Sequence, residues 1–325
     1  MKRCASLTLL AVGFSAALAN GAAAPQPGWN EASIDINGQQ RWYRIYVPRQ
    51  RAEVAPAVVL LHGGTQSMRR MFGKRSGGTR EWPALAEREG VVLITPNGTD
   101  ANGGNPNGDR QNWHDYREDF RAANVDDVAF IRRLVIEQTR TRRLDAQRIY
   151  VTGASNGGMM TYRLLIDAPE LFAAGAAFIA NLPENADRLP KPPRPTPLMI
   201  VNGTEDPLVK WDGGTVGRDR GATISTRQTL EWWLSANAAR SEVERRETLP
   251  DRDPEDGCRL ELQTHAAKPA GAPVWLYTAR GAGHAMPSIR HAVPDSRLIR
   301  RIVGTACRDA EGAELAWAFF KTTQR

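Results

Sequence analysis

A pentapeptide of small residues, Gly153-Ala154-Ser155-Asn156-Gly157, constrains the fold of this chain more than any other feature. The apolar, β-branched run before it (148–152) predicts a short buried strand, and residues 158–165 after it predict a helix. At such a strand–turn–helix junction the central serine is strained and its Oγ stands above the sheet, beside a helix N-terminus that favours negative charge. G-x-S-x-G also occurs by chance, but this context predicts that Ser155 is a nucleophile.

Short apolar runs alternate with helical patterns along the chain. We expect strands at 33–37, 41–47, 57–61, 91–95, 172–179, 197–201 and 274–278, and helices at 82–88, 125–139, 223–237 and 311–321. Asn37-Gly38-Gln39-Gln40 predicts a hairpin turn between the first two strands, and Asn124 is the expected N-cap of the second helix. The alternation predicts the α/β class, with a mostly parallel central sheet and helices on both faces, in a single domain over residues 25–325.

The predicted nucleophile needs a base to take its proton and an acid to orient that base. Enzymes with this turn carry them in the chain order serine, acid, histidine, on loops after later strands. Asp206 follows the strand at 197–201 and His284 follows the strand at 274–278, so both are expected at the same sheet edge as Ser155. The weaker alternatives are Glu205, Asp212, His265 and His291.

An oxyanion hole in such a site uses two backbone N–H groups. One belongs to the residue after the nucleophile, here Asn156. The other comes from the loop after the third strand, here His62-Gly63-Gly64-Thr65, and Gly64 is the expected donor. We interpret His62 as a structural residue that hydrogen-bonds within this loop.

The polar, Gly- and Asn-rich stretch 96–123 is longer than a simple connection requires, which is typical of functional loops. It begins at the predicted catalytic edge of the sheet, so we expect part of it to border the substrate mouth. Within it, Trp113 is predicted to bind substrate by walling the acyl pocket, and Asp115 to brace the loop. The alternative is that Trp113 only pins the loop to the core.

The N-terminus has the features of an export signal. Lys2 and Arg3 precede an apolar run (7–19), and cleavage motifs end at Ala19 and Ala24. The run is shorter than the ~20 residues that span a bilayer. We therefore assign residues 1–24 to a signal peptide, and expect a soluble, secreted or periplasmic protein without a membrane anchor.

Outside this signal the chain has two cysteines, Cys258 and Cys307. They are expected to form a disulfide in an oxidising compartment, the alternative being two separate buried thiols. Two cysteines are too few for a metal cluster and no histidine pair has ligand spacing, so neither a metal nor a cofactor is expected. The net charge of +7, or +5 without Lys2 and Arg3, comes from scattered arginines, which argues against a nucleic-acid partner.

Several segments together resemble a known family. They are Leu61-His62-Gly63-Gly64, 124–128, 153–160, 202–206 and 281–287. They look like the polyhydroxybutyrate depolymerase and feruloyl or acetylxylan esterase group of α/β-hydrolases, over roughly residues 40 to 322. The resemblance implies an exported serine carboxylesterase with Ser155, Asp206 and His284 as its triad, acting on a small ester or an oligomer.

The chain departs from the family pattern at three positions. Members often have Trp where this chain has Met286, and many have Cys at the positions of Gly64 and Asn112. No added polymer-binding domain is recognisable, which favours soluble esters or oligomers as substrates. The alternatives are a serine peptidase, because oligopeptidases also use Ser-Asn-Gly-Gly turns, and a non-catalytic binding protein, which would be expected to lack a triad member.

Overall fold

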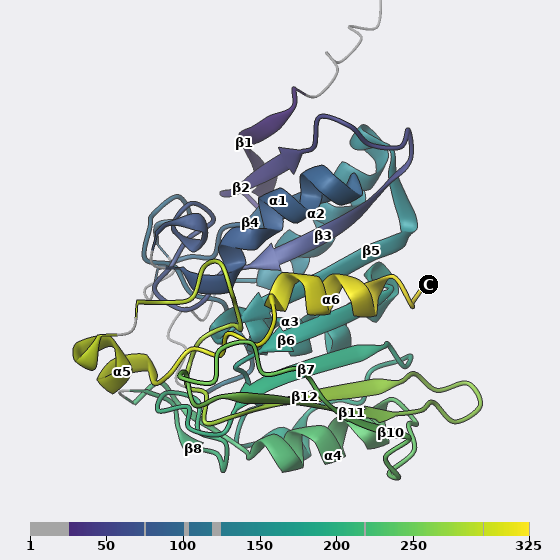
Figure 1. Ribbon diagram of the computed structural model, residues 1–325. Helices are drawn as coiled ribbons and strands as arrows, with labels where there is room; N and C mark the ends of the chain where they lie inside the picture. The colour runs from purple at the N-terminus through teal and green to yellow at the C-terminus, as the bar shows by residue number, and fades with distance from the viewer. Residues whose placement is uncertain are drawn as a thin grey trace, which may run out of the picture.

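Ten strands form one sheet in the computed structural model, which describes residues 26–74, 76–100, 104–118, 125–217, 219–294 and 296–324. Their order is β1-β2-β4-β3-β5-β6-β7-β12-β11-β10 (Figure 1). Their bounds are β1 Gly28–Ile36, β2 Gln39–Val47, β3 Ala55–Leu61, β4 Val92–Pro96, β5 Leu144–Ala154, β6 Ala174–Phe178, β7 Leu198–Gly203, β10 Arg245–Thr248, β11 Arg259–His265 and β12 Val274–Arg280. The six central strands run parallel to one another: β4, β3, β5, β6, β7 and β12. The outer strands on both sides are antiparallel to their neighbours.

The central strands are apolar because both of their faces are covered. All seven residues of β3 and all five of β6 are buried, as is typical of parallel strands between helix layers. At the sheet edge, the predicted hairpin turn has positive φ at Asn37 (54°) and Gly38 (83°), the backbone of a two-residue turn that matches strand twist. Each strand expected from the sequence is present in this sheet.

Helices cover both faces of the sheet. Figure 1 shows α1 (Trp82–Glu89) and α6 (Gly312–Phe320) in front of it and α2 (Asp127–Arg142) and α3 (Asn156–Asp167) behind it, while α4 (Thr226–Ala236) packs below. One buried cluster joins α1 and α6 to the front face, and a second joins α2, α3 and α4 to the other. This arrangement confirms the predicted α/β-hydrolase fold.

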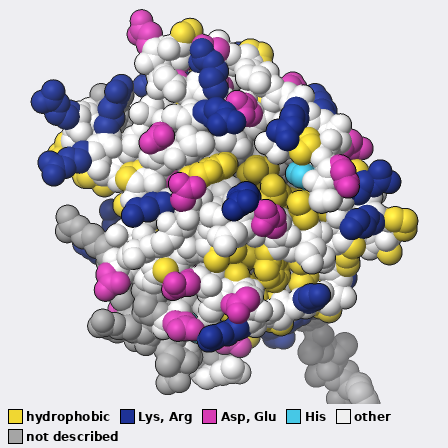
Figure 2. Space-filling model, turned by 90° about the horizontal axis from the view of Figure 1, so that it is seen from below, with side chains coloured by type: hydrophobic (Ala, Val, Ile, Leu, Met, Phe, Trp, Pro, Cys, Tyr) yellow, Lys and Arg dark blue, Asp and Glu magenta, His cyan; other side chains and the backbone are white. Residues whose placement is uncertain are grey.

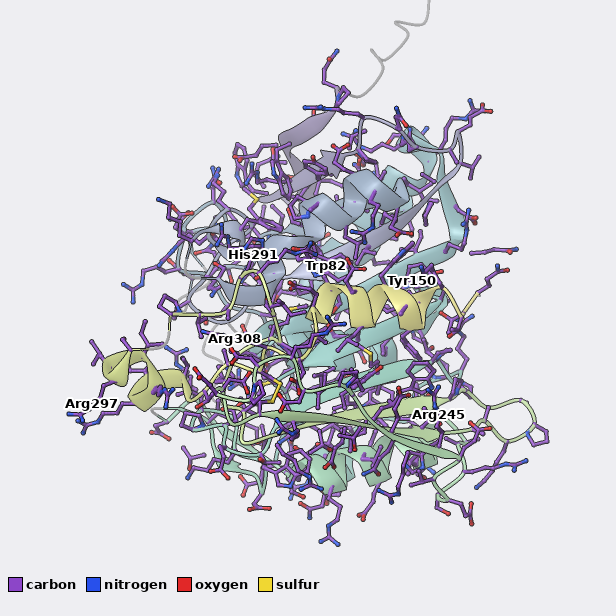
Figure 3. All side chains as sticks on the ribbon, in the orientation of Figure 1. Trp82, Tyr150, Arg245, His291, Arg297 and Arg308 are labelled. Atoms are coloured by element: carbon purple, nitrogen blue, oxygen red, sulfur yellow. A yellow bond between two sulfur atoms is a disulfide. The ribbon has the colours of Figure 1, made fainter. Side chains whose placement is uncertain are left out.

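The C-terminal helix is locked onto the central sheet by aromatic contacts. Figure 3 shows Tyr150, from β5, beside α6. Its ring stacks on Phe320 with centroids 4.6 Å apart, and its hydroxyl donates to the Thr323 carbonyl over 3.1 Å. Because β5 leads directly to Ser155, α6 supports the strand that carries the predicted nucleophile.

The start of α2 differs from the prediction. The N-cap is Asp126, whose carboxylate accepts a hydrogen bond of 2.9 Å from the Ala129 amide. A carboxylate there satisfies a free N–H of the first turn and interacts well with the helix dipole. Asn124, the expected cap, lies outside the described residues.

Some elements were not predicted from the sequence. They are β10 and β11 at the sheet edge, the short pair β8 (Gly214–Thr215) and β9 (Ala222–Thr223), and α5 (Arg297–Val303). β10 is largely exposed and charged, so it lacks the apolar alternation that identifies a strand in sequence. α5 has helically spaced apolar residues at 298, 299, 302 and 303, but it is only seven residues long and none of its residues is buried. Figure 1 shows α5 standing out at the left of the molecule.

Cys258 and Cys307 form the predicted disulfide, with Cα atoms 5.3 Å apart. Figure 3 shows it as a yellow bond near Arg308. It joins the chain just before β11 to the segment that follows α5. Both cysteines are fully buried, and the bond between them excludes the alternative of separate thiols in this structure.

The described surface carries charges of both signs. Figure 2 shows one face on which basic and acidic side chains are interspersed, with hydrophobic side chains gathered between them. The basic side chains on this face of Figure 2 form no continuous stripe. Across the described residues, no helix is both long enough and apolar enough to cross a bilayer. The predicted signal peptide, 1–24, lies outside the described residues.

Candidate active site

Ser155 occupies a strained turn between β5 and α3. Its φ of 56° and ψ of −125° are unfavourable for any residue with a side chain, and its amide donates to the Phe178 carbonyl over 2.9 Å. A Cβ on Gly153 would lie 2.5 Å from the Gly157 carbonyl oxygen, and one on Gly157 would lie 2.3 Å from the Leu61 oxygen. The two glycines thus let β5, α3 and β3 approach closely enough to hold this turn.

Asp206 and His284 form a hydrogen-bonded pair at the ends of neighbouring strands. Nδ1 of His284 lies 2.7 Å from Oδ2 of Asp206, and Asp206 Oδ1 accepts from the amides of Leu208 and Val209, both at 2.8 Å. These contacts fix the Asp206 carboxylate, which is 5% exposed. With Nδ1 engaged by the carboxylate, Nε2 is the ring nitrogen that can accept a proton.

The alternative acids and bases lie elsewhere. Glu205 and Asp212 are exposed. Nδ1 of His265 contacts the Arg240 carbonyl at 3.1 Å, and Nε2 of His291 lies 3.5 Å from the buried carboxylate of Glu81. Neither histidine lines the cavity that contains Ser155.

Ser155 and His284 line the same cavity, whose volume is about 530 Å³. Gly64, Asn156 and His62 line it too, at the ends of β3 and β5. The rest of the wall is mostly apolar, from Met71, Ile179, Leu208, Val216, Met286, Val293, Ile302 and Val303. Met286, the position where family members often have Trp, therefore contributes an aliphatic wall next to His284. The structure brings together five of the predicted site residues: the three proposed catalytic residues and both proposed oxyanion-hole residues.

His62 is a structural residue of the loop after β3. Nδ1 donates to the Gly63 carbonyl at 2.9 Å, and Nε2 accepts from the Gly98 amide at 3.0 Å. Burial lowers the pKa of His62 to about 4, so the ring is neutral at pH 7. It ties the loop after β3 to the loop after β4, and does not serve as a base.

Asn112 braces the loop that contains Gly64. Its Oδ1 accepts a hydrogen bond of 3.2 Å from the Thr65 amide, which is therefore not available to a substrate oxygen. The amides of Gly64 and Asn156 remain as the candidate oxyanion donors in the cavity wall. A Cβ on Gly64 would stand 3.2 Å from the same oxygen. These are the two positions where many family members have Cys. Here a hydrogen bond connects the two loops at that point.

Trp113 does not wall the cavity, and this prediction needs correction. The residue is fully buried, its indole N–H donates to the His62 carbonyl at 2.9 Å, and it is not among the cavity-lining residues. Its backbone pairs with the side chain of Asn156, which accepts from the Trp113 amide at 2.8 Å and donates to its carbonyl at 2.9 Å. The structure therefore favours the alternative in which Trp113 pins the loop.

The long loop nevertheless borders the cavity, through Asn112 and Arg117 on either side of Trp113. Asp115 braces the loop as expected. Its carboxylate accepts hydrogen bonds from the Arg117 amide and also from the side chains of Arg117 and Asn156. Sequence reasoning missed Arg117 and also Arg220, a second arginine in the cavity wall. Arg220 follows a glycine-rich segment without a recognisable motif, so no local signal pointed to it.

Comparison with known proteins connects this geometry to esterases. A protein of Nocardia uniformis subsp. tsuyamanensis named as an esterase, NocK, is 32% identical over 78% of this chain and 73% of its own length. Feruloyl esterase B of Piromyces equi is 28% identical over 50% of this chain, and poly(3-hydroxyalkanoate) depolymerase C of Paucimonas lemoignei 31% identical over 42%. The chain spans only 29% and 30% of the lengths of these last two relatives.

A family model and a solved structure agree with these relatives. The prolyl oligopeptidase family model matches residues 81–183, which include the Ser155 turn. An acetyl xylan esterase from Aspergillus awamori superposes with a TM-score of 0.53 at 18% identity, over 80% of this chain and 95% of that one, and shares the fold. Because the NocK match extends over most of both proteins, this chain belongs to the esterase group of α/β-hydrolases that includes the polyhydroxybutyrate depolymerases and the feruloyl and acetylxylan esterases.

Proposed function

We propose that the protein is an exported serine carboxylesterase that hydrolyses its substrate through an acyl-enzyme intermediate on Ser155. The observation that carries this proposal is the 2.7 Å contact between His284 Nδ1 and Asp206 Oδ2, in a site where Ser155 and His284 line one cavity. The substrates we infer are hydroxyalkanoate oligomers or feruloyl and acetyl esters. The relatives' names support these classes, and residues 1–24 support export.

In this mechanism His284 Nε2 takes the proton of Ser155 as Oγ attacks the ester carbonyl. Asp206 keeps Nδ1 protonated and stabilises the positive charge that develops on the ring. The oxygen that becomes negative is stabilised by the amides of Gly64 and Asn156. His284 then protonates the departing alcohol, and a water activated by the same nitrogen releases the acid and regenerates Ser155.

The site requires no metal or cofactor for this chemistry, since the serine hydroxyl supplies the nucleophile. The imidazole carries the proton between steps, so one base serves both acylation and deacylation. We propose that residues 25–325 form a single catalytic domain, because one sheet extends through the described residues from β1 to β10.

The test is Ser155→Ala. This variant should lose hydrolysis of p-nitrophenyl acetate and labelling by a fluorophosphonate while keeping the melting temperature of the wild type. The matched control is Ser235→Ala, because Ser235 is an exposed serine on α4 far along the chain from the site. Labelling that persists in Ser155→Ala would reject the assignment. A wild type that neither hydrolyses esters nor takes up the label would favour the non-catalytic alternative.

The family model match to prolyl oligopeptidases supports a second candidate, a serine peptidase. Both candidates use the same triad, so only substrate comparison separates them. A peptidase would cleave a proline-containing peptide p-nitroanilide with a kcat/KM at least comparable to that for its best ester. We expect the opposite ranking, because the match that covers 78% of this chain is to a protein named as an esterase.

A further inference from the structure

Two arginines are the charged side chains in the wall of the substrate cavity. In the described part of the chain, Arg117 and Arg220 line the cavity and no Asp or Glu does. The other walls are apolar side chains, backbone and small polar residues. A positive charge at the rim of an apolar cavity attracts anions more strongly than it would on an open surface. The two arginines, however, have different environments.

Arg117 is already neutralised by Asp115. Its side chain is 9% exposed, its Nε lies 2.9 Å from Asp115 Oδ1, and its Nη2 lies 2.8 Å from Asp115 Oδ2. This two-point pairing fixes the plane of the guanidinium. The remaining nitrogen, Nη1, donates to the Arg220 carbonyl over 2.5 Å. Arg117 thus holds the backbone of Arg220 in place, while its own charge is balanced.

Arg220 is not balanced in this way. It sits at the tip of the β8–β9 hairpin, where its amide donates to the Val216 carbonyl over 3.1 Å. Its Nη1 lies 3.4 Å from the position that a Cβ on Gly64 would occupy, so the guanidinium lies against the proposed oxyanion loop. Across the described ranges of the chain, no carboxylate pairs with this guanidinium. An arginine stays charged at any physiological pH.

We propose that Arg220 binds a carboxylate of the substrate, so that the enzyme prefers esters that carry a free carboxylate a few atoms from the scissile carbonyl. This inference rests on the proposed esterase function. With the carbonyl oxygen at the Gly64 amide, a carboxylate on the same molecule can reach the guanidinium and form the paired hydrogen bonds that arginine favours. The carboxylate can belong to the acyl side, as in a half-ester of a dicarboxylic acid. It can also belong to the alcohol side, as at the free end of a hydroxyalkanoate oligomer.

The test compares matched pairs of charged and neutral esters. For the acyl side the pair is monomethyl glutarate and methyl 5-oxohexanoate, in which a methyl ketone replaces the carboxylate. For the alcohol side it is the 3-hydroxybutyrate dimer as free acid and as methyl ester, with cleavage of the internal ester followed by chromatography. We expect kcat/KM to be about tenfold or more higher for the charged member of one pair, and the pair that shows it identifies the side.

Arg220→Gln should lower kcat/KM for that charged substrate by about tenfold or more, and change its neutral partner by less than about twofold. Arg220→Lys should keep part of the preference, because lysine keeps the charge but lacks the paired N–H donors of the guanidinium. Arg117→Gln should also lower the ratio of kcat/KM for the charged ester to kcat/KM for its neutral partner. A general loss of stability would lower both values equally, so this ratio reports the positioning of Arg220. Arg227→Gln, an exposed arginine on α4, is the matched control and should leave the ratio unchanged.

Two results would overturn the inference while leaving the esterase proposal intact. One is a wild type that hydrolyses p-nitrophenyl acetate but shows no preference for either charged ester. The other is an equal loss on both members of a pair in Arg220→Gln, which would assign Arg220 to the oxyanion or to the structure of the loop. A wild type that hydrolyses none of these esters would instead reject the proposed function, and the carboxylate site with it.

Discussion

Removing the disulfide should destabilise the protein by an amount that follows from its place in the chain. Cys258 and Cys307 are 49 residues apart, and on the chain-entropy model a closed loop of this length stabilises the folded state by about 4 kcal/mol. Both positions are fully buried, so the double variant is best made with Ala, which introduces no buried hydroxyl. With an unfolding entropy near 2 cal/mol/K per residue, a chain of this size should lose about 6 °C in melting temperature.

The effect should also reach the active site. The segment that the disulfide anchors runs alongside the His284 loop: the Gly283 amide donates to the Thr305 carbonyl over 2.7 Å, and the Ser288 amide to the Cys307 carbonyl over 3.0 Å. These bonds hold the turn from which His284 reaches Asp206. Heat inactivation of the esterase should therefore shift to lower temperature together with the melting transition.

The assay is urea denaturation and thermal melting of wild type and of the double variant, with and without dithiothreitol. Reductant should bring the wild type close to the double variant and leave the double variant unchanged, because only the wild type has a bond to reduce. A loss below about 1 kcal/mol would refute the loop-entropy reasoning. So would a reductant effect of equal size on both proteins.

Two further predictions concern the loops that build the site. Gly157→Ala should lower the free energy of unfolding by about 3 kcal/mol or more, because the new Cβ would lie 2.3 Å from the Leu61 carbonyl oxygen. The control is Gly104→Ala, whose Cβ would have no atom within 4 Å and which should leave the urea midpoint nearly unchanged. Equal midpoints for the two variants would contradict this. His62 should make the stability of the protein depend on pH. Its unfolded pKa near 6.5 exceeds its folded pKa of about 4, so the unfolded state binds the proton first and stability falls by up to ~3 kcal/mol as pH drops through this window. His62→Gln, which can keep both hydrogen bonds, should show a smaller loss between pH 7 and pH 4.5, and an unchanged slope would exclude this role.

The catalytic edge could be predicted because each of its residues follows a buried strand. Each of the three predicted catalytic residues follows an apolar run that forms a strand: Ser155 follows β5, Asp206 follows β7 and His284 follows β12. Parallel strands end at the same edge of a sheet, so chain order and strand pattern together place these loops near one another. That step needs no knowledge of distant contacts, and the 2.7 Å contact between His284 and Asp206 agrees with it.

The arginines of the cavity wall depend on contacts that local patterns do not encode. Arg220 reaches the oxyanion loop because the β8–β9 hairpin turns sharply, with positive φ at Gly217 (53°), Asp219 (56°) and Gly221 (74°). Arg117 meets the Arg220 carbonyl across 103 positions of sequence. Neither the turn geometry nor this pairing follows from the polarity of the residues, and scattered arginines are usually interpreted as solvated surface.

Trp113 shows why the same loop was only partly predictable. A large aromatic residue in a long polar loop fits a pocket wall and a core anchor equally well, and the difference depends on whether its polar groups find partners. Here the Asn156 side chain satisfies the Trp113 amide and carbonyl, and the His62 carbonyl satisfies its indole N–H, so full burial costs no unpaired group. Because Asn156 directly follows Ser155, this anchor fixes the loop to the catalytic turn. Asn112 and Arg117 then face the cavity from fixed points, and Trp113 acts on the substrate only through the neighbours it positions.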